Sequence, residues 1–263
     1  MAWTRRYDDP EPQRVNKWLA QSGVCSRREA EGLIAQGLVF IDGERVDDAG
    51  RKILTGQTLV LNDSAQEKLS SSLSVVLHKP IGIVSSLPQD DQIEAATLLT
   101  KDALWGEADV IPNASNNFAP LGRLDRESRG LLVLSEDGVL AKALIGPESE
   151  LDKEYNVLLT GVITDKKIAL LRHGLELDGR KLRPAKVRQV SEQKLNIVLK
   201  EGRNRQIRRM AELVELRVVE LMRVRVGPLT LGDLPEGKWR PLTPQERTAL
   251  IDASKPPIRE RDT

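Results

Sequence analysis

Apolar residues near the N-terminus recur at the spacing of two short amphipathic helices, predicted around residues 14–20 and 26–37. Ser26 and Glu29 have the spacing of a capping box at the start of the second helix, and Gly37 occupies the position where a helix commonly ends. The apolar stripes are Val15, Trp18 and Leu19 in the first helix, and Ala30, Leu33 and Ile34 in the second. These boundary signals make the second helix the best-specified local element of the chain.

The pattern then changes to short β runs. Residues 38–41 and 45–46 flank Asp42-Gly43-Glu44, a turn sequence typical of a tight hairpin, and residues 58–61 supply a further strand. Residues 63–72 are polar and rich in serine. They predict a linker, although a Ser-rich loop within one domain would have the same composition.

The remainder alternates between apolar runs and helical stripes, which indicates a larger mixed domain. Residues 87–119 are less regular: helix is possible over Glu94 to Leu104, and an Asn-rich irregular loop follows. Further strands are predicted at 75–77, 131–134, 153–159 and 217–226, several short strands between 175 and 200, and helices at 138–145, 164–172 and after 239–246.

An arginine-rich segment near residue 205 has its own helical stripe. Ile207, Met210, Ala211 and Val214 fall at i, i+3, i+4 and i+7, so this face is expected to be buried, with the arginines on other faces. Four arginines occur within seven residues, at 203, 205, 208 and 209. This density favours a polyanionic or carboxylate partner over a merely solvated surface.

Composition excludes several classes of site. The 40 Lys and Arg nearly balance the 39 Asp and Glu, so affinity for nucleic acid must come from local clusters. The single cysteine, Cys25, excludes an internal disulfide and a Cys-based zinc site, and it is best explained as a small buried residue. The sequence has two histidines, and they lie far apart in it. We therefore expect neither a His-rich metal site nor a Ser/His catalytic pair. An export signal and a membrane span are absent from the sequence pattern, and we expect a cytoplasmic protein.

One stretch places a candidate catalytic residue in a turn. Residues 121–130, LGRLDRESRG, place Asp125 in a Gly-bounded, Arg-rich loop that leads into a strongly apolar strand. A loop aspartate by itself more often accepts backbone hydrogen bonds than reacts. Motifs in other parts of the chain, described below, favour a catalytic role for Asp125 instead.

Residues 13–62 resemble a known RNA-binding domain. The string R-x-x-K-x-L-A followed by CSRREAEGLIAQGLVFIDGERV is similar to the S4 domain over residues 13–62. The resemblance implies that the basic helix pair docks structured RNA, with Arg14, Lys17, Ser26, Arg27 and Arg28 as contacts. Arg27 and Arg28 stand in a first helical turn, where the helix dipole disfavours cations, so a phosphate there would offset a local cost; the alternative is that both are simply solvated.

The motifs KPIGIVSS, GRLDRESRGLLVLSEDG, KEYNV and EGRNRQIRRM, in that order behind an S4 domain, closely resemble the RsuA-type ribosomal RNA pseudouridine synthases. CSRREA and the ending P-x-G-x-W-R-x-L-T are most similar to the RluF type, which acts on 23S rRNA. The resemblance implies an α+β fold, with an S4 domain followed by a catalytic domain whose mainly antiparallel mixed sheet is flanked by helices and crossed by a cleft. Residues 100–119 form a longer connection than compact members have.

The same resemblance assigns roles. It implies that Asp125 is the catalytic aspartate, Tyr155 the active-site tyrosine, Arg208 the basic partner that keeps Asp125 ionised, and Leu221 the apolar residue beside the target base. From the residues alone, Tyr155 would be a half-buried packing residue. Arg123 is the candidate to fill the space that a flipped uridine vacates or to hold phosphates. Further RNA contacts are expected at Lys79, Arg203, Asn204 and Arg205.

The predicted organisation is an S4 domain at 13–62, a linker at 63–72, a catalytic domain at 73–252 and a charged tail at 253–263. The expected partner is ribosomal RNA, with no metal, no small-molecule cofactor and no membrane, and the protein is expected to be a monomer. Three alternatives stay open: the same chemistry on 16S rRNA or tRNA, a non-catalytic S4-type ribosome-assembly factor, and a glycosidase. The last would need a second well-placed carboxylate, for which we find no candidate.

Overall fold

The computed structural model describes residues 2–255, which form two compact units. The first comprises residues up to 74 together with 135–142, and the second comprises 75–134 and the chain from 143 onward. Each unit contains its own hydrophobic cluster. They are described separately below.

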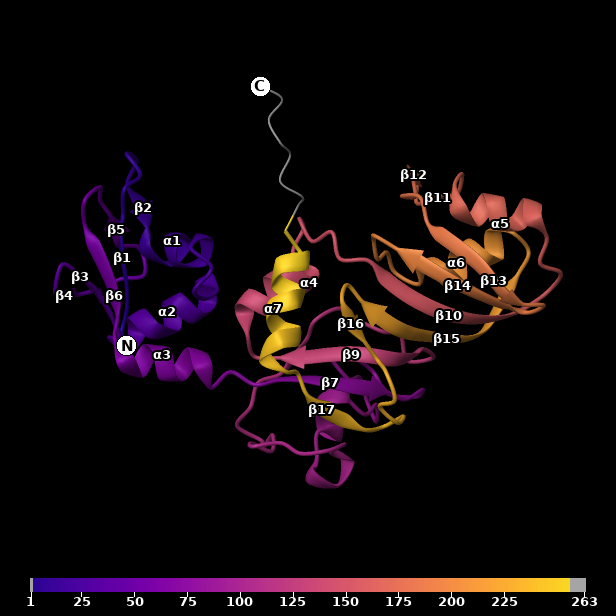
Figure 1. The fold of residues 1–263 in the computed structure, drawn as a ribbon, viewed down its shortest axis with the longest axis horizontal. Coiled ribbons are helices and arrows are strands. Elements are labelled where there is room, and N and C mark those ends of the chain that lie inside the picture. The colour runs from indigo at the N-terminus through magenta and orange to yellow at the C-terminus, as the bar shows by residue number, and fades with distance from the viewer. Residues whose placement is uncertain (1, 256–263) are drawn as a thin grey trace. The chain divides into compact units, whose positions relative to one another are not determined.

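The first unit combines helices with two small sheets (Figure 1). A four-stranded antiparallel sheet has the order β1-β6-β3-β4, and β2 pairs with β5. Trp18, Leu19, Leu33 and Ile34 from the helices pack with Leu59 in the core. The elements are β1 (Trp3–Arg6), β2 (Gln13–Arg14), α1 (Val15–Gln21), α2 (Arg27–Ala35), β3 (Val39–Ile41), β4 (Glu44–Arg45), β5 (Lys52–Ile53), β6 (Thr58–Leu61) and α3 (Asp63–Ser70).

The local signals around α2 are confirmed. The Ser26 hydroxyl accepts from the Glu29 amide at 3.2 Å, while the Glu29 carboxylate accepts from the Ser26 amide at 2.6 Å. At the other end Gly37 has φ +70°, and Leu38 N–H donates to Leu33 O, which is a Schellman motif. Asp42 and Gly43 both have positive φ between β3 and β4, as a two-residue type I′ hairpin requires.

Two elements of the first unit differ from the sequence prediction. Strand β1 precedes residue 13, where the domain was expected to start, and pairs with β6 along its whole length. Residues 63–72, predicted as a linker, contain α3, whose first turn is capped by the Asn62 side chain. Ala65 is fully buried and Leu69 packs against the core, so a short apolar contact is enough to fold this polar segment onto the unit.

The second unit is built on a nine-stranded sheet with the order β13-β14-β10-β15-β9-β7-β17, to which β16 and β8 add at β15 and β9. The determined pairs are antiparallel except β15 with β9, which is parallel, so the expected α+β fold with a mainly antiparallel mixed sheet is confirmed. From residue 74 onward the elements are β7 (Ser74–Lys79), η1 (Ala95–Leu98), η2 (Lys101–Ala103), β8 (Ala119–Pro120), β9 (Arg129–Ser135), α4 (Gly138–Ile145), β10 (Lys153–Thr160), α5 (Asp165–Arg172), β11 (Glu176–Leu177), β12 (Arg180–Lys181), β13 (Lys186–Ser191), β14 (Lys194–Leu199), α6 (Gln206–Leu213), β15 (Arg217–Val226), β16 (Leu229–Thr230), β17 (Trp239–Pro241) and α7 (Pro244–Ala253). Most of α4 belongs to the first unit.

Helices α5 and α6 pack on the sheet and share one core with it (Figure 1). The predicted stripe of α6 is confirmed, since Ile207, Met210, Ala211 and Val214 are all buried. Strand β10 alternates as expected: Tyr155, Val157 and Leu159 face this core, while the residues between them are less buried. The periodicity of the sequence therefore fixes which face of each element is buried.

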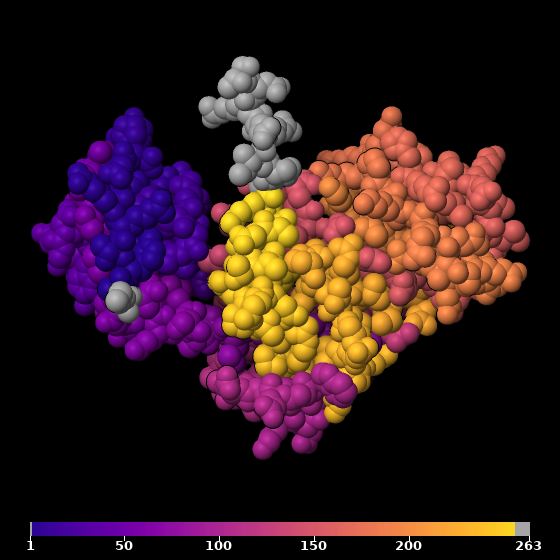
Figure 2. Space-filling model, viewed as in Figure 1, coloured from indigo at the N-terminus to yellow at the C-terminus, as the bar shows by residue number. Residues whose placement is uncertain are grey.

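The irregular connection before β9 contains little regular structure. Where helix was considered possible, between 94 and 104, only the 3-10 turns η1 and η2 form. Figure 2 shows this part of the chain, coloured magenta, gathered on the surface of the second unit. The predicted tail at 253–263 lies mostly outside the described residues, because only its first three positions are described.

At Gly130 two strands of the sheet approach each other closely. It has φ +112° and lies opposite Arg223 where β9 and β15 run parallel, and a Cβ at this position would overlap the backbone N and O of Arg223. Only a residue without a side chain allows the two strands to approach this closely. The loop that carries Asp125 ends at this contact.

We predict that Gly130→Ala destabilises the protein by about 3 kcal/mol or more, because the clash is with backbone and cannot be relieved by a side-chain rotation. Urea unfolding measures the loss. Gly174→Ala is the matched control, since Gly174 also has positive φ, at +127°, but a Cβ there meets nothing within 4 Å. Equal losses in the two variants would contradict a steric origin.

Candidate active site

Asp125 lies in a turn that is fastened on both sides. Ser128 N–H donates to Asp125 O at 3.0 Å, which closes the turn. Before it, the buried hydroxyl of Ser85 accepts from Leu124 N–H at 2.9 Å and donates to Leu124 O at 2.8 Å. After it, Gly82 N–H donates to Arg126 O at 2.8 Å. The KPIGIVSS segment thus holds the backbone of the GRLD segment, while the side chain of Asp125 stays 29% exposed.

Strand register brings three more residues to this turn. Arg223 of β15 lies opposite Gly130 of β9 on one side and opposite Tyr155 of β10 on the other. Leu221, two residues earlier in β15, lies opposite Val157. Asp125, which stands five residues before Gly130, is therefore placed near Tyr155, Leu221 and Arg223, although the four come from distant parts of the sequence.

These residues line one cavity of about 590 Å³ in the second unit. Asp125, Tyr155 and Leu221 contribute to its wall. Tyr155 is only 9% exposed, so its ring presents an edge or part of a face to the cavity. Basic side chains surround them: Arg123, Lys153, Arg183, Lys200, Arg203, Arg205 and Arg223. Glu201 is a second carboxylate in the lining, and it is paired with Arg203 at 3.4 Å. A cavity with a carboxylate at Asp125, a tyrosine, an aliphatic wall and a mostly basic rim can hold an anionic ligand that carries a flat ring.

The cation beside Asp125 is Arg205. Its Nη1 lies 3.9 Å from Asp125 Oδ2 and 2.7 Å from Glu127 Oε2. The hydrogen bond from Arg205 holds the pKa of the Glu127 carboxyl below its usual range. Arg205 was expected to contact RNA, and its placement beside two carboxylates adds an electrostatic role.

The expected ion pair between Arg208 and Asp125 is not formed, and that prediction is wrong. Arg208 is 9% exposed and its Nη2 donates instead to Glu127 O at 2.9 Å and to Ser128 Oγ at 3.3 Å. It was also expected to project away from the buried face of α6. Because it follows Ile207 by only about 100° around the helix, it is buried against the turn that carries Asp125. Arg208 therefore braces the backbone of that turn.

The prediction that Lys79 contacts RNA is also wrong. The side chain is fully buried, and its ammonium donates to Pro80 O at 2.8 Å and Ile83 O at 2.7 Å. Burial lowers the pKa of Lys79 to about 8, an effect that the nearby Asp125 partly opposes. Lys79 thus supports the segment beneath the turn and supplies a buried positive charge.

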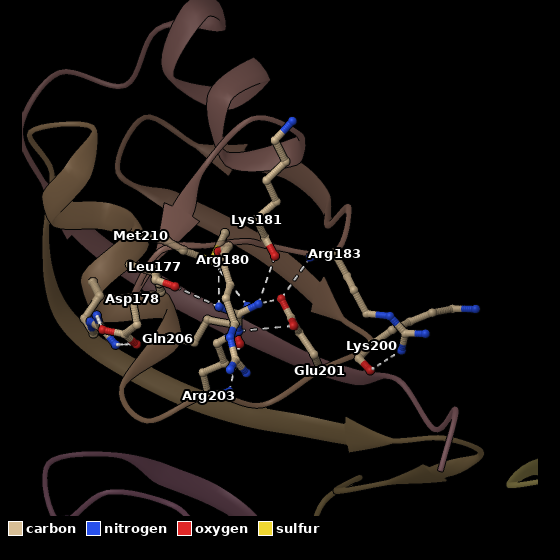
Figure 3. Close-up of polar contacts among 11 residues, drawn as sticks. Leu177, Asp178, Arg180, Lys181, Arg183, Lys200, Glu201, Arg203, Gln206 and Met210 are labelled. Carbon is tan, nitrogen blue, oxygen red and sulfur yellow. Dashed lines mark hydrogen bonds and ion pairs between the residues drawn. The ribbon is translucent and has the colours of Figure 1, made fainter. Parts of the chain in front are cut away.

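Arg203 holds a hairpin at the rim of the cavity (Figure 3). Its Nη1 donates to Leu177 O at 2.9 Å and Arg180 O at 3.2 Å, its Nη2 donates to Lys181 O at 2.9 Å, and its Nε lies 3.4 Å from Glu201 Oε2. These contacts fasten β11 and β12 to the start of α6. The guanidinium of Arg203 is thus engaged mainly with groups of the protein itself. Its contact with RNA stays a prediction.

Arg123 and Asn204 remain available. Both are exposed and line the cavity, and neither side chain pairs with another side chain among the described residues. Arg123 has its backbone O held by Arg223 Nη1 at 3.4 Å, so its side chain is free to move while its backbone is anchored. This is the arrangement expected of a side chain that meets a ligand.

Sequence reasoning missed Arg223 and the bracing role of Ser85. Arg223 is 2% exposed and its Nε donates to Leu131 O at 2.8 Å, so it ties β15 to β9 beneath the cavity. A signal was present, because Arg223 stands on the same face of β15 as the buried Leu221. An arginine on an inward-facing strand position indicates a structural or functional requirement.

In the first unit the proposed RNA contacts occupy the helix pair. Arg14, Lys17, Arg27 and Arg28 are exposed, and the first two also line a cavity of about 580 Å³ together with Lys52. Ser26 differs, because its hydroxyl is engaged as the cap of α2. Cys25 is buried, as expected of a small apolar residue, and burial raises the pKa of its thiol to about 12.

Neither a metal site nor a membrane span is found among the described residues. No group of three or more His, Cys, Asp and Glu is arranged to hold a metal ion there. In the same residues, no helix has both the length and the apolar character needed to cross a bilayer.

Two family patterns match the two parts of the chain. Residues 13–59 match the S4 domain, and residues 74–213 match RNA pseudouridylate synthase. A solved structure described as a pseudouridylate synthase is 27% identical, covers 90% of this chain and 99% of its own, and superposes with a TM-score of 0.62.

Curated relatives match nearly the whole chain. The dual-specificity RNA pseudouridine synthase RluF of Salmonella typhi is 36% identical over 247 residues, which are 92% of this chain and 78% of that protein. The ribosomal large subunit pseudouridine synthase B of Bacillus subtilis is 33% identical over 252 residues, covering 92% of this chain and 98% of that protein.

Proposed function

Because the chain belongs to the RNA pseudouridylate synthase family and is an RNA pseudouridine synthase, we propose that it converts one specific uridine of 23S ribosomal RNA to pseudouridine. The relative named for the ribosomal large subunit supports this choice of RNA. A 23S rRNA substrate implies that the protein acts in the cytoplasm, either on free RNA or on an assembling ribosomal subunit.

The observation that carries the catalytic assignment is the carboxylate of Asp125, held in a fastened turn at the wall of a cavity with a basic rim. The reaction breaks a C–N glycosidic bond, turns the base and forms a C–C bond, so it needs neither redox chemistry nor net hydrolysis. An ionised carboxylate can attack C1′ of the ribose or C6 of uracil, or assist removal of the 2′ proton. All three routes begin from Asp125.

The neighbours of Asp125 have complementary tasks. Arg205, at 3.9 Å, places a positive charge beside the carboxylate, and this attraction strengthens when bound RNA excludes water. Tyr155 packs against the uracil and assists loss of the C5 proton, and Leu221 forms the apolar wall beside the base. A uridine within a helix must leave its stack to reach them, and Arg123 fills the vacated space or holds the flanking phosphates.

The direct test incubates the purified protein separately with unmodified 23S rRNA, 16S rRNA and tRNA transcripts and maps pseudouridine by carbodiimide modification. Conversion of a single uridine in 23S rRNA is the expected result. Conversion only in 16S rRNA or tRNA would overturn the choice of RNA and leave the chemistry intact. RNA binding without conversion on any of the three would favour an assembly factor.

The first unit is proposed to dock the RNA through α1 and α2. We expect Arg27→Ala together with Arg28→Ala to weaken binding and to reduce the slope of log K against log salt by roughly 1.5, because each arginine releases about one counterion. Filter binding at several salt concentrations measures the slope. Arg6→Ala is the control, since Arg6 is exposed in the same unit but already pairs with Asp8 at 3.4 Å. An unchanged slope in the double variant would exclude phosphate contacts at α2.

A further inference from the structure

A second carboxylate, Glu127, stands two residues after Asp125 in the same turn. Arg205 Nη1 lies 2.7 Å from Glu127 Oε2 and 3.9 Å from Asp125 Oδ2, so a single nitrogen faces both acids. At 2.7 Å a charge-assisted hydrogen bond is formed, whereas at 3.9 Å only the charges interact. Asp125 therefore has a positive charge beside it but does not accept a hydrogen bond from Arg205.

The backbone of Arg205 is held in an unusual conformation. Its φ of 50° is left-handed, at the residue that precedes α6. That conformation is unfavourable for a non-glycine residue, and such strain persists only where the surroundings impose it. The contact with Glu127 and the start of α6, where Arg209 N–H donates to Arg205 O at 3.0 Å, fix the guanidinium at the cavity wall.

Stability does not account for this ion pair. The side chains of Arg205 and Glu127 are 43% and 59% exposed, and exposed pairs contribute little to folding. Glu127 also places a negative charge beside a rim on which basic side chains predominate, where it opposes an RNA backbone. A carboxylate in this position lowers affinity for RNA, so its contribution must lie elsewhere.

We propose that Glu127 is a positioning residue that restrains Arg205 beside Asp125 and prevents it from hydrogen bonding to the reacting carboxylate. This inference rests on the proposed role of Asp125. Without the Glu127 charge, Arg205 closes the gap and donates to Asp125, which makes the carboxylate a poorer nucleophile or base. RNA binding is unaffected or strengthened, because a negative charge has been removed.

The test compares Glu127→Gln, Glu127→Asp and Asp178→Asn under single-turnover and steady-state conditions. We expect Glu127→Gln to lower kcat about tenfold without raising KM, and Glu127→Asp to recover most of kcat. Asp178→Asn is the matched control: it breaks a pair on the same helix, in which Arg209 donates to Asp178 at 2.9 and 2.6 Å, and should change neither constant. A kcat of Glu127→Gln within twofold of the wild type, a matching rise in KM, or the same loss in Asp178→Asn would overturn the proposal.

A crystal structure of Glu127→Gln supplies a readout that does not depend on activity. We expect Arg205 to move within hydrogen-bonding distance of Asp125, at about 2.8 Å. If Arg205 stays where it is, the restraint does not exist, even when the wild type makes pseudouridine. If the wild type modifies no RNA while Arg205 moves as expected, the proposed function fails and the restraint stands.

Discussion

Asp125→Asn is expected to reduce pseudouridine formation by roughly 10³-fold or more, because the amide can neither attack the sugar or base nor accept the proton that the reaction displaces. The substitution is nearly isosteric. It leaves the backbone contacts of Leu124, Arg126 and Ser128 in place, so the turn should keep its geometry. Single-turnover assays with 23S rRNA measure the rate.

RNA affinity and thermal stability are the controls for Asp125→Asn. Both should stay close to those of the wild type, because the basic rim and the S4 unit are unchanged. A variant that retains more than a tenth of the wild-type rate would show that Asp125 is not the reacting group. A rate loss that is matched by loss of RNA binding would instead assign Asp125 to docking.

Arg208→Met is expected to have the second-largest effect on the rate, a fall of about 10- to 100-fold, although Arg208 does not pair with Asp125. The methionine fills much of the volume but removes the donors to Glu127 O and Ser128 Oγ. The turn that carries Asp125 then loses its hydrogen bonds to Arg208, while those with Ser85 and Gly82 remain. Loss of these bonds from a buried site should also lower the free energy of unfolding by about 1–2 kcal/mol.

Arg208→Lys distinguishes bracing from simple packing. A lysine ammonium can reach one of the two acceptors, so part of the rate should return, whereas a role limited to filling space would give equal rates for Met and Lys. RNA affinity should be similar in all three proteins. A fall in affinity for both variants would mean that Arg208 contacts RNA directly and that its burial in the free protein is not maintained.

Local structure was largely predictable from the sequence, because its determinants are close in the chain. The capping box at Ser26, the positive φ of Gly37 and the type I′ turn at Asp42-Gly43 each depend on a few neighbouring residues. The α6 stripe was predictable for the same reason. The exceptions are β1 and α3, which are polar and fold because distant partners are present: β6 for the strand, and the core of the first unit for Ala65.

The pairing of charges in the candidate site was not predictable. Nothing in the string RNRQIRRM indicates that Arg205, rather than Arg208, lies beside Asp125, because the choice depends on the left-handed residue before α6 and on the approach of that helix to the turn. Lys79 shows the same limit. A lysine beside proline and glycine suggests an exposed loop, yet its side chain is fully buried and its ammonium donates to two nearby carbonyls.

The most direct measurement maps the pseudouridines of ribosomal RNA in cells that lack this protein and in the same cells supplied with either the wild type or Asp125→Asn. One position in 23S rRNA should be unmodified without the protein, restored by the wild type, and left as uridine by the variant at equal abundance. If Asp125→Asn restores the modification, the carboxylate at the wall of the cavity is not the group that performs the reaction.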